Sequence, residues 1–289
     1  SVDPAALSIW LGKHVDEEYA LEAFEDLARG WVSQDPAAAT AFYEDLPDGK
    51  AKEQGIYEMA RTWGNDDLAG LGEFSGNILI GFGLLSMFVA GIFILRQPDY
   101  KRMLAYSSIE NMGIIAFGVG IGGFALYGAI LHMIHHSLIK SSLFLSAGNI
   151  LTGFNTKVVD RIGGLIKYLP RTFLSFFAGF VGISGLPPFG IFISELFILI
   201  GAFQTGHPIS AVLFMFSLLL VLAGAAQIVT DMSFGGNEQE APIGRERWLR
   251  IVPPYVLLLT SIALCVWMPN EMYNTIMNTI QIIGGTIHG

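Results

Sequence analysis

Long apolar runs fill the chain from Ser75 onward, at intervals that suit membrane-crossing helices. A helix needs about 20 mostly apolar residues to cross the hydrocarbon core of a bilayer. The pattern predicts spans at residues 76–95, 103–121, 124–152, 172–203, 210–232 and 251–268. A shorter stretch at 271–284 is apolar on one face and is expected to lie along the membrane interface. The predicted fold class is therefore all-α, a polytopic transmembrane helix bundle of about six spans.

The fourth apolar segment, 172–203, is too long for one plain span. The sequence SGLPPFG lies in its middle, at 184–190. Two prolines cannot continue the backbone hydrogen-bond ladder of a helix. We therefore expect two half-helices joined by an unwound stretch.

Residues 1–74 follow a different pattern, with the 3.6-residue periodicity and polar faces of short soluble helices. The sequence ARGWVSQDPA at 28–37 recurs as ARTWGNDDLA at 60–69. The two copies are offset by 32 residues, and a repeat period of this size is typical of stacked helical hairpins. Asp35 is expected to cap a helix whose first residue is Pro36. We interpret this part as a small soluble, acidic helical repeat region that docks on a partner, because no cluster of carboxylates or histidines there indicates catalysis.

Composition and charge narrow the class of protein. The chain is 52% hydrophobic and only 14% charged, which excludes an ordinary soluble domain. Residues 1–75 hold 16 acidic and 5 basic side chains, so the net charge of -9 belongs to the first region. The basic residues farther on flank apolar segments as membrane anchors do, and they predict no nucleic-acid partner. Cys265 stands alone in an apolar run, so neither a disulfide framework nor a thiolate metal site is expected.

Two basic loops predict the orientation in the membrane. Basic residues lie between the first two spans and between the third and fourth: Arg96, Lys101, Arg102, Lys157, Arg161, Lys167 and Arg171. Such loops face the cytoplasm. Alternation from there places residues 1–74 and the C-terminus on the outer side of a bacterial inner membrane. The chain begins SVDPAALSIW, without Met or a signal peptide, which leaves a start farther upstream open.

Ionisable side chains lie inside the predicted third span. His132, His136 and Lys140 are spaced i, i+4 and i+8, which places them in one stripe along a helix, with His135 beside it. Lys140 lies midway along the predicted span, with apolar or small residues for about three turns on either side, too deep for an easy reach to the headgroups. A charge at that depth costs roughly 2.5 to 3.5 kcal/mol, so it indicates a functional site.

Our hypothesis for this stripe is a proton relay, because a lysine in apolar surroundings and a histidine can both take up and release a proton. Two alternatives stay open. The stripe could serve structural hydrogen bonding. Three histidines on one helix could also bind zinc, although no carboxylate or Cys lies at ligand spacing within the segment.

Two carboxylates lie in neighbouring spans. Glu195 follows the LPPFG break by about one to two turns, where the end of a half-helix and burial act on its charge in opposite directions. Such a carboxylate can switch its charge, or it can simply cap backbone donors freed by the break. Glu110 lies beside Ser107, Ser108 and Asn111, a polar patch that could hold water, pair with the histidine stripe or only form interhelical hydrogen bonds.

Three motifs of the chain together resemble a known family. RQPDYKRMLAYSSIENMG, LHMIHHSLIKSSLFLSAGN and GLPPFGIFISELFIL, in this order and spacing, are similar to the proton-conducting, antiporter-like membrane subunits of respiratory complex I and of membrane-bound hydrogenases. With the ending VWMPNEMYNTIMNTIQIIGG, the likeness is greatest to hydrogenase-4 component F. It covers the chain from about residue 75 to the end.

The resemblance implies that the six spans are the last six of a fourteen-helix fold, with GLPPFG in its second broken helix. It also implies roles: Lys140 and His136 match the central proton relay, His132 extends it, and Glu195 matches the terminal ionisable residue. The family's first eight helices are absent here, so a complete path of two half-channels is not expected. Asn111 stands where relatives have His, which weakens a branch through Glu110.

These inferences predict a membrane subunit of a redox-driven ion-pumping complex, of the hydrogenase-4 or NADH:quinone oxidoreductase type, that contributes a proton half-channel. The expected partners are other membrane and electron-transfer subunits and the lipid bilayer. The chain itself is expected to be non-catalytic and to bind no cofactor, because it contains no flavin or iron–sulfur motif. Two rival functions are a transport-inactive anchor that presents the helical repeats and a component of a cation/proton antiporter.

Overall fold

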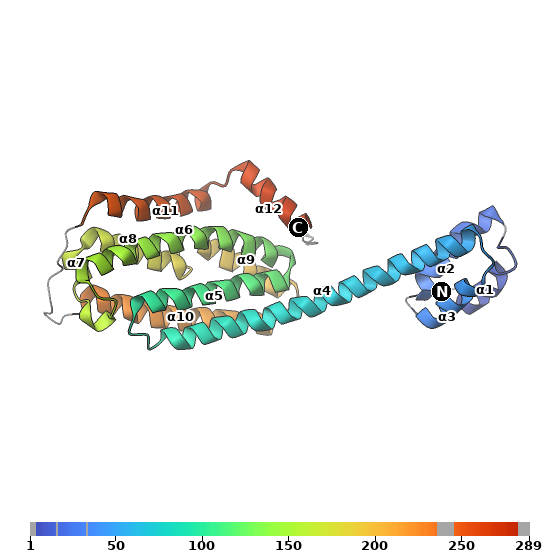
Figure 1. The fold of residues 1–289 in the computed structure, drawn as a ribbon, viewed down its shortest axis with the longest axis horizontal. Coiled ribbons are helices and arrows are strands. Elements are labelled where there is room, and N and C mark those ends of the chain that lie inside the picture. The colour runs from blue at the N-terminus through green and yellow to red at the C-terminus, as the bar shows by residue number, and fades with distance from the viewer. Residues whose placement is uncertain (1–3, 16, 33, 236–245, 283–289) are drawn as a thin grey trace. The chain divides into compact units, whose positions relative to one another are not determined.

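The computed structural model describes residues 4–15, 17–32, 34–235 and 246–282. In these ranges the chain forms helices and one isolated β-bridge, between Asp99 and Val158. It divides into two compact units, Ser1–Ser75 and Gly76–Gly289, and the boundary falls within helix α4, Lys50–Ile94 (Figure 1). The two units have separate hydrophobic cores.

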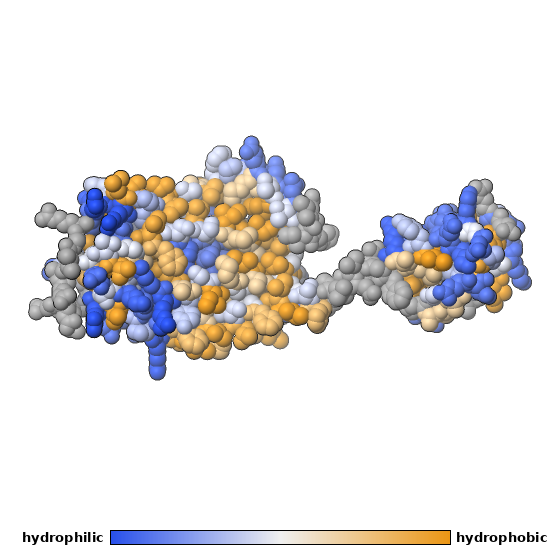
Figure 2. All heavy atoms as spheres, viewed as in Figure 1, coloured by the Kyte–Doolittle hydropathy of each residue, from blue (hydrophilic) through white to orange (hydrophobic). Residues whose placement is uncertain are grey.

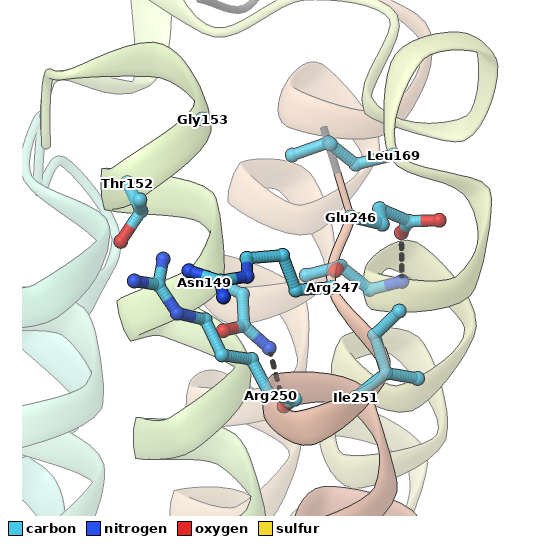
Figure 3. A pocket seen from close by; sticks show the side chains of 9 residues that line it. Asn149, Thr152, Gly153, Leu169, Glu246, Arg247, Arg250 and Ile251 are labelled. Carbon is cyan, nitrogen blue, oxygen red and sulfur yellow. Dashed lines mark hydrogen bonds between the residues drawn. The ribbon is translucent and has the colours of Figure 1, made fainter. Parts of the chain in front are cut away.

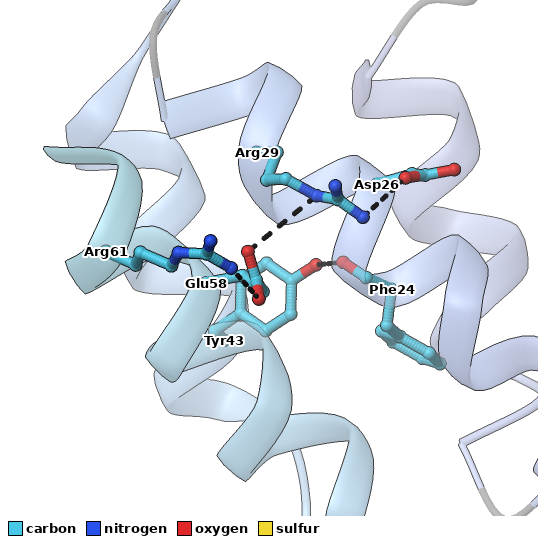
Figure 4. A network of polar contacts seen from close by, with 6 residues as sticks. All are labelled: Phe24, Asp26, Arg29, Tyr43, Glu58 and Arg61. Carbon is cyan, nitrogen blue, oxygen red and sulfur yellow. Dashed lines mark hydrogen bonds and ion pairs between the residues drawn. The ribbon is translucent and has the colours of Figure 1, made fainter. Parts of the chain in front are cut away.

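Short helices pack around one small core in the first unit. They are α1 (Pro4–Leu11), η1 (Glu18–Ala20), α2 (Leu21–Val32), α3 (Pro36–Asp45) and the beginning of α4. The buried apolar cluster contains Leu11, Phe24, Leu27, Tyr43 and Met59. The Tyr43 hydroxyl donates to the Phe24 carbonyl oxygen at 2.5 Å, so a hydrogen bond ties α3 to α2 inside this core (Figure 4).

Asp35 caps α3. Its side chain accepts a hydrogen bond from the Ala38 amide at 3.0 Å, and Pro36 occupies the first turn, where a missing N–H costs nothing. The prediction made from the Asp-Pro pair is confirmed.

The two copies of the sequence repeat fold differently. The first copy, 28–37, runs from α2 through a turn into α3, whereas the second copy, 60–69, lies wholly inside α4. The expectation of stacked hairpins is therefore wrong for the second copy. Pro36 has no N–H to donate into a continuing helix and so opens a new one, whereas Leu68 at the matching position can donate and the helix continues.

Matching arginines of the repeat nevertheless meet at one carboxylate. Arg29 on α2 and Arg61 on α4 lie 3.8 and 3.5 Å from Glu58, and Arg29 also pairs with Asp26 at 2.9 Å (Figure 4). Both arginine side chains are at least half exposed, so each pair stabilises the unit by no more than about 1 kcal/mol.

The second unit is a bundle of long apolar helices. Besides the end of α4 it contains α5 (Tyr100–Ile121), α6 (Gly123–Phe154), η2 (Val159–Arg161), α7 (Leu165–Tyr168), α8 (Pro170–Ile183), α9 (Gly190–Gln204), α10 (Pro208–Phe234), α11 (Trp248–Val266) and α12 (Asn270–Ile282). Four helices in the described ranges are long and apolar enough to cross a membrane: Phe74–Ile94, Tyr100–Ile121, Pro208–Phe234 and Trp248–Val266. Helix α6 is 32 residues long. It is not among these four helices, because its histidines and lysine lower its mean hydropathy. The predicted all-α polytopic bundle is confirmed.

The segment predicted to be discontinuous is broken at the expected place. Helix α8 ends at Ile183 and α9 begins at Gly190, with Pro187 and Pro188 between them. Neither proline has an N–H to continue a helical ladder. Both half-helices pack against α6, which also contacts α5 and α11.

Close packing of α6 on α9 depends on glycine. A Cβ at Gly128 would lie 2.8 Å from the Ser194 carbonyl oxygen and 2.9 Å from the Ile198 amide, so only a residue without a side chain fits there. Small residues let the backbones of membrane helices approach closely. The polar side chains of α6 and α9 are thereby brought within hydrogen-bonding reach of each other.

The one-sided apolar stretch near the C-terminus forms α12. Its residues Ile276 and Ile280 pack on Leu126 of α6. Residues 283–284, which the prediction included, lie outside the described part of the chain. A position of α12 along the membrane interface stays a prediction.

On the face of the second unit seen in Figure 2, the surface is mostly hydrophobic along the helices, and hydrophilic side chains gather at the end where α7 lies and along α12. The exposed apolar side chains include Phe82, Leu85, Val212, Phe216 and Leu259. Soluble proteins rarely expose continuous apolar surface of this extent. With its spanning helices, this surface identifies a multi-pass membrane protein.

Candidate functional site

Polar side chains are buried where α5, α9 and α11 pack on α6. They are Ser107, Glu110 and Asn111 on α5, His132, His135, His136 and Lys140 on α6, and Ser194 and Glu195 on α9. None is more than 8% exposed. The five residues predicted to form a relay, Lys140, His136, His132, Glu195 and Glu110, all belong to this group. Their roles in proton transfer stay a prediction.

A chain of hydrogen bonds connects α5, α6 and α9. Asn111 donates its amide to Glu110 Oε2 and to the Ser107 carbonyl oxygen, both at 2.7 Å. The Asn111 oxygen lies 3.0 Å from His132 Nε2, and His132 Nδ1 lies 2.9 Å from the Ser194 hydroxyl. The polar patch on α5 therefore pairs with the histidine stripe.

The partners of His132 fit both of its protonation states. The Asn111 oxygen can only accept, so Nε2 carries a proton in the neutral ring, and Nδ1 then accepts from Ser194. When Nδ1 is protonated, it donates to Ser194 instead, and the serine hydroxyl turns to the Ile191 carbonyl oxygen, 2.8 Å away. The ring therefore gains or loses a proton without losing a hydrogen bond. The tautomer follows from the hydrogen-bond partners.

Lys140 has a neutral partner. Its Nζ donates to the Ser107 hydroxyl at 2.5 Å, and that hydroxyl donates in turn to the Leu104 carbonyl oxygen at 3.2 Å. The Phe144 ring centre lies 5.8 Å from Nζ. Among the described residues, no carboxylate lies within ion-pair distance of Lys140.

His136 lies between His132 and Lys140 on the stripe. Its ring centre is 6.3 Å from that of His132, with the two planes nearly parallel at 13°. The Nε2 atom is buried, and it has no hydrogen-bond partner within the described ranges. A buried polar atom without a partner is costly, so this position is suited to a bound water molecule.

Glu195 lies close to the break between the half-helices. Its carboxylate lies against Gly185, whose φ of 65° is a conformation that glycine adopts without strain, and a Cβ at Gly185 would overlap the carboxylate. No hydrogen bond to this carboxylate occurs in the part of the chain that the structure describes. Glu195 lines a mostly apolar cleft of about 360 Å³ between α9 and α10.

His135 faces away from the rest of the stripe. Its Nδ1 lies 3.0 Å from the Ser261 hydroxyl on α11, and Gly190 lies against its ring. It lines a cavity of about 380 Å³ that includes Tyr127, Cys265 and Tyr273. In the described ranges, no three His, Cys, Asp or Glu side chains are grouped so that they could hold a metal ion.

Sequence reasoning missed two serines of this site. Ser194 and Ser261 each bind a histidine of α6, but serine is common in membrane helices and its spacing carries no separate signal. Pairing them with His132 and His135 required the packing of α9 and α11 on α6.

The sequence profile of the family described as "NADH:quinone oxidoreductase/Mrp antiporter, TM" matches residues 51–221, more than half of the chain. The chain belongs to this family, and the resemblance inferred from three motifs is confirmed. The matched range begins in α4 at residue 51, ahead of the start near residue 75 that the motifs indicated.

Relatives of the chain include a hydrogenase component homolog and an antiporter subunit. The "Hydrogenase-4 component F homolog" of Methylacidiphilum infernorum is 34% identical over 188 residues, which cover 65% of this chain and 39% of the relative. An Na(+)/H(+) antiporter subunit of Bacillus subtilis is 31% identical over 233 residues, covering 78% of this chain and 45% of the relative. The chain thus spans less than half the length of each.

A solved structure shares the fold. The Mrp complex from Dietzia sp. DQ12-45-1b matches with a TM-score of 0.62 at 18% identity, covering 97% of this chain and 66% of that chain.

Proposed function

We propose that this chain moves protons in the membrane as one subunit of an ion-pumping complex of the hydrogenase-4 or NADH:quinone oxidoreductase type. It contributes a proton half-channel whose ionisable groups are Lys140, His136, His132, Glu195 and Glu110. Electron carriers on separate chains drive the movement, and this chain takes no part in electron transfer.

The observation that carries the proposal is the burial of Lys140 with no carboxylate within ion-pair distance in the described ranges. A charge in the middle of a membrane helix costs roughly 2.5 to 3.5 kcal/mol. An apolar side chain of similar length would fill the same space without that cost. A lysine that releases and regains a proton gives a reason to keep the charge.

The contacts support a proposed route for the proton. Ser107 accepts from Lys140, and together with Glu110 and Ser184 it lines a small cavity beside the stripe. A water there would connect the serine hydroxyl to the Glu110 carboxylate. The carboxamide of Asn111 positions His132 but cannot itself pass a proton on, so this branch needs water.

The relatives support a subunit of a larger complex. One is named as a component F homolog of hydrogenase-4 and another as a subunit of an Na(+)/H(+) antiporter. Electron-transfer and membrane subunits on other chains are the proposed partners. From the positive charge of the basic loops, we propose that the end formed by α7 faces the cytoplasm of a bacterial cell and that the first unit and the C-terminus face the outer side.

The test is proton uptake by the complete complex. The complex is purified from its source membrane, reconstituted in liposomes with an entrapped pH dye, and started with its own reductant. Lys140→Ala and Glu195→Ala are each expected to lower proton uptake per electron by about ten-fold or more, because each removes a group that exchanges a proton.

Matched surface variants separate a relay from a general loss of charge. Lys167→Ala on α7 and Glu271→Ala on α12 remove the same charges from exposed positions and should stay within about two-fold of wild type. Co-purification of the remaining subunits shows that each variant assembles. Wild-type uptake in both assembled relay variants would favour the transport-inactive anchor instead.

The antiporter relative favours a second candidate, exchange of protons for a cation. The same liposomes, without reductant but with an imposed Na⁺ gradient, test it. Proton movement that follows the gradient and disappears in Lys140→Ala would assign this chain to an antiporter.

A further inference from the structure

A polar pocket lies at one end of the bundle, where α6 ends and α8 and α11 begin (Figure 3). Its polar lining consists of Asn149, Thr152, Thr172, Glu246, Arg247 and Arg250. Asn149 follows Lys140 by nine residues on α6, or about 13 Å of helix, so the pocket is separate from the buried stripe.

Hydrogen bonds between helices build the walls of this pocket. Asn149 donates its side-chain amide to the Arg250 carbonyl oxygen at 2.9 Å, which joins α6 to the start of α11. Glu246 accepts from the Thr172 amide at 2.7 Å, which joins the segment before α11 to α8. The pocket is therefore held by the backbone and not by flexible side chains alone.

Two arginines give the pocket a positive charge. The side chains of Arg247 and Arg250 both point toward Thr152, whereas the Glu246 carboxylate lies on the opposite side against Thr172 (Figure 3). Within the described ranges, neither guanidinium has an ion pair with a carboxylate. Two like charges at one pocket repel each other, and an anion between them would remove that repulsion.

Exposed apolar side chains lie next to the two arginines in the sequence, at the start of α11. Trp248 is 63% exposed, and the guanidinium of Arg171 lies 4.3 Å from its ring centre. Leu249 and Val252, in the first turns of the spanning helix α11, are 84% and 48% exposed. Tryptophan and arginine at the end of a spanning helix mark the level of the lipid headgroups. The two arginines therefore lie at the level where anionic phospholipid headgroups are available.

We propose that this pocket binds the phosphate of an anionic phospholipid. Arg247 and Arg250 contact the phosphate oxygens, and the acyl chains extend from there into the bilayer. Guanidinium groups match phosphate because their paired N–H donors contact two oxygens at once. The bound lipid holds the start of α11 against the end of α6, and this role is independent of proton transfer.

Lipid retention by the full chain tests the proposal. The protein is purified in mild detergent, equilibrated with equimolar phosphatidylglycerol and phosphatidylcholine, and weighed by native mass spectrometry. Wild type is expected to keep one phosphatidylglycerol in about ten-fold preference to phosphatidylcholine. The double variant Arg247→Gln, Arg250→Gln is expected to lose that preference.

A matched double variant controls for total charge. Arg96→Gln with Lys101→Gln removes two positive charges from the loop between α4 and α5, at the same end of the bundle but outside the pocket. It should keep the wild-type preference. An equal loss in both double variants, or no preference in wild type, would overturn the proposal.

Two further measurements test the two-point contact with phosphate and distinguish a lipid from a free anion. Arg250→Lys preserves the charge and replaces the forked guanidinium, so it is expected to lower retention about three-fold with unchanged thermal unfolding. Full retention in this variant would contradict a two-point contact with phosphate. Displacement of phosphatidylglycerol by millimolar inorganic phosphate would show a site for a free anion and would overturn the lipid assignment.

Discussion

The ammonium group of Lys140 meets a hydroxyl and not a carboxylate. The sequence identified this lysine because its depth in an apolar run makes its charge costly. Its partner could not be identified in the same way. Ser107 and Ser108 are adjacent on α5, and only the packing of α5 on α6 decides that the first of them faces Lys140, 33 residues away.

Ser107→Ala is expected to slow proton uptake by the reconstituted complex. It removes the hydroxyl that accepts from Lys140 Nζ, and a hydrogen bond to a charged group contributes about 1.5 to 3 kcal/mol. The expected fall is therefore about ten-fold or more. Ser108→Ala is the control, because that hydroxyl donates only to the Leu104 carbonyl oxygen. Equal uptake in the two variants would remove Ser107 from the route.

Ser194→Ala tests the two-state hydrogen bonding of His132. Without the hydroxyl, neither protonation state of His132 keeps its bond at Nδ1, at a cost of about 1 kcal/mol. Proton uptake should fall about five-fold, and Ser194→Thr, which keeps a hydroxyl, should restore most of it. Ser217→Ala on α10, where the hydroxyl bonds within its own helix, should leave the rate unchanged. Failure of Thr to restore uptake would contradict the proposed switch of the serine.

At the scale of elements, local signals decided what could be predicted. The break between α8 and α9 was visible because prolines end a helix wherever they stand. The continuous helix at the second repeat copy was harder to predict. Residues 60–69 match residues 28–37, which form a helix, a turn and a helix start, at five positions, but they lack the proline that starts the new helix. The packing of α6 on α9 could not be predicted from the sequence, because it depends on a glycine contact between segments that are far apart in the chain.

Gly185→Ala is expected to disturb the break in two ways. Gly185 has φ of 65°, which strains any residue with a side chain, and its new Cβ would displace the Glu195 carboxylate. Gly206 has a similar φ of 78° but open space around it, so Gly206→Ala introduces the strain alone. Gly206→Ala should lose about 1 kcal/mol of stability in thermal unfolding, Gly185→Ala should lose more because of the overlap, and only Gly185→Ala should also lower proton uptake. Equal uptake in the two would show that the position of Glu195 does not matter.

At the scale of the molecule, the chain combines a bundle of its membrane family with a first unit that has a core of its own. Among the residues whose side chains the structure describes, the buried clusters of the second unit contain none from the first unit. The sequence pattern located the change from short amphipathic helices to long apolar runs near residue 75. It did not predict that one helix, α4, continues across this point, although no helix-stopping residue lies there. Separate cores imply that the stability of each unit depends on its own contacts.

Tyr43→Phe tests this independence in the full chain. The variant leaves the Phe24 carbonyl oxygen without its buried partner, which costs about 1 to 2 kcal/mol, so the first unit should open roughly 5 to 30 times more often. Hydrogen exchange followed by mass spectrometry should show faster exchange in α2 and α3 and unchanged exchange in α6. Tyr57→Phe, at a side chain that is largely exposed, should change neither. Faster exchange in α6 as well would mean that the two units unfold together.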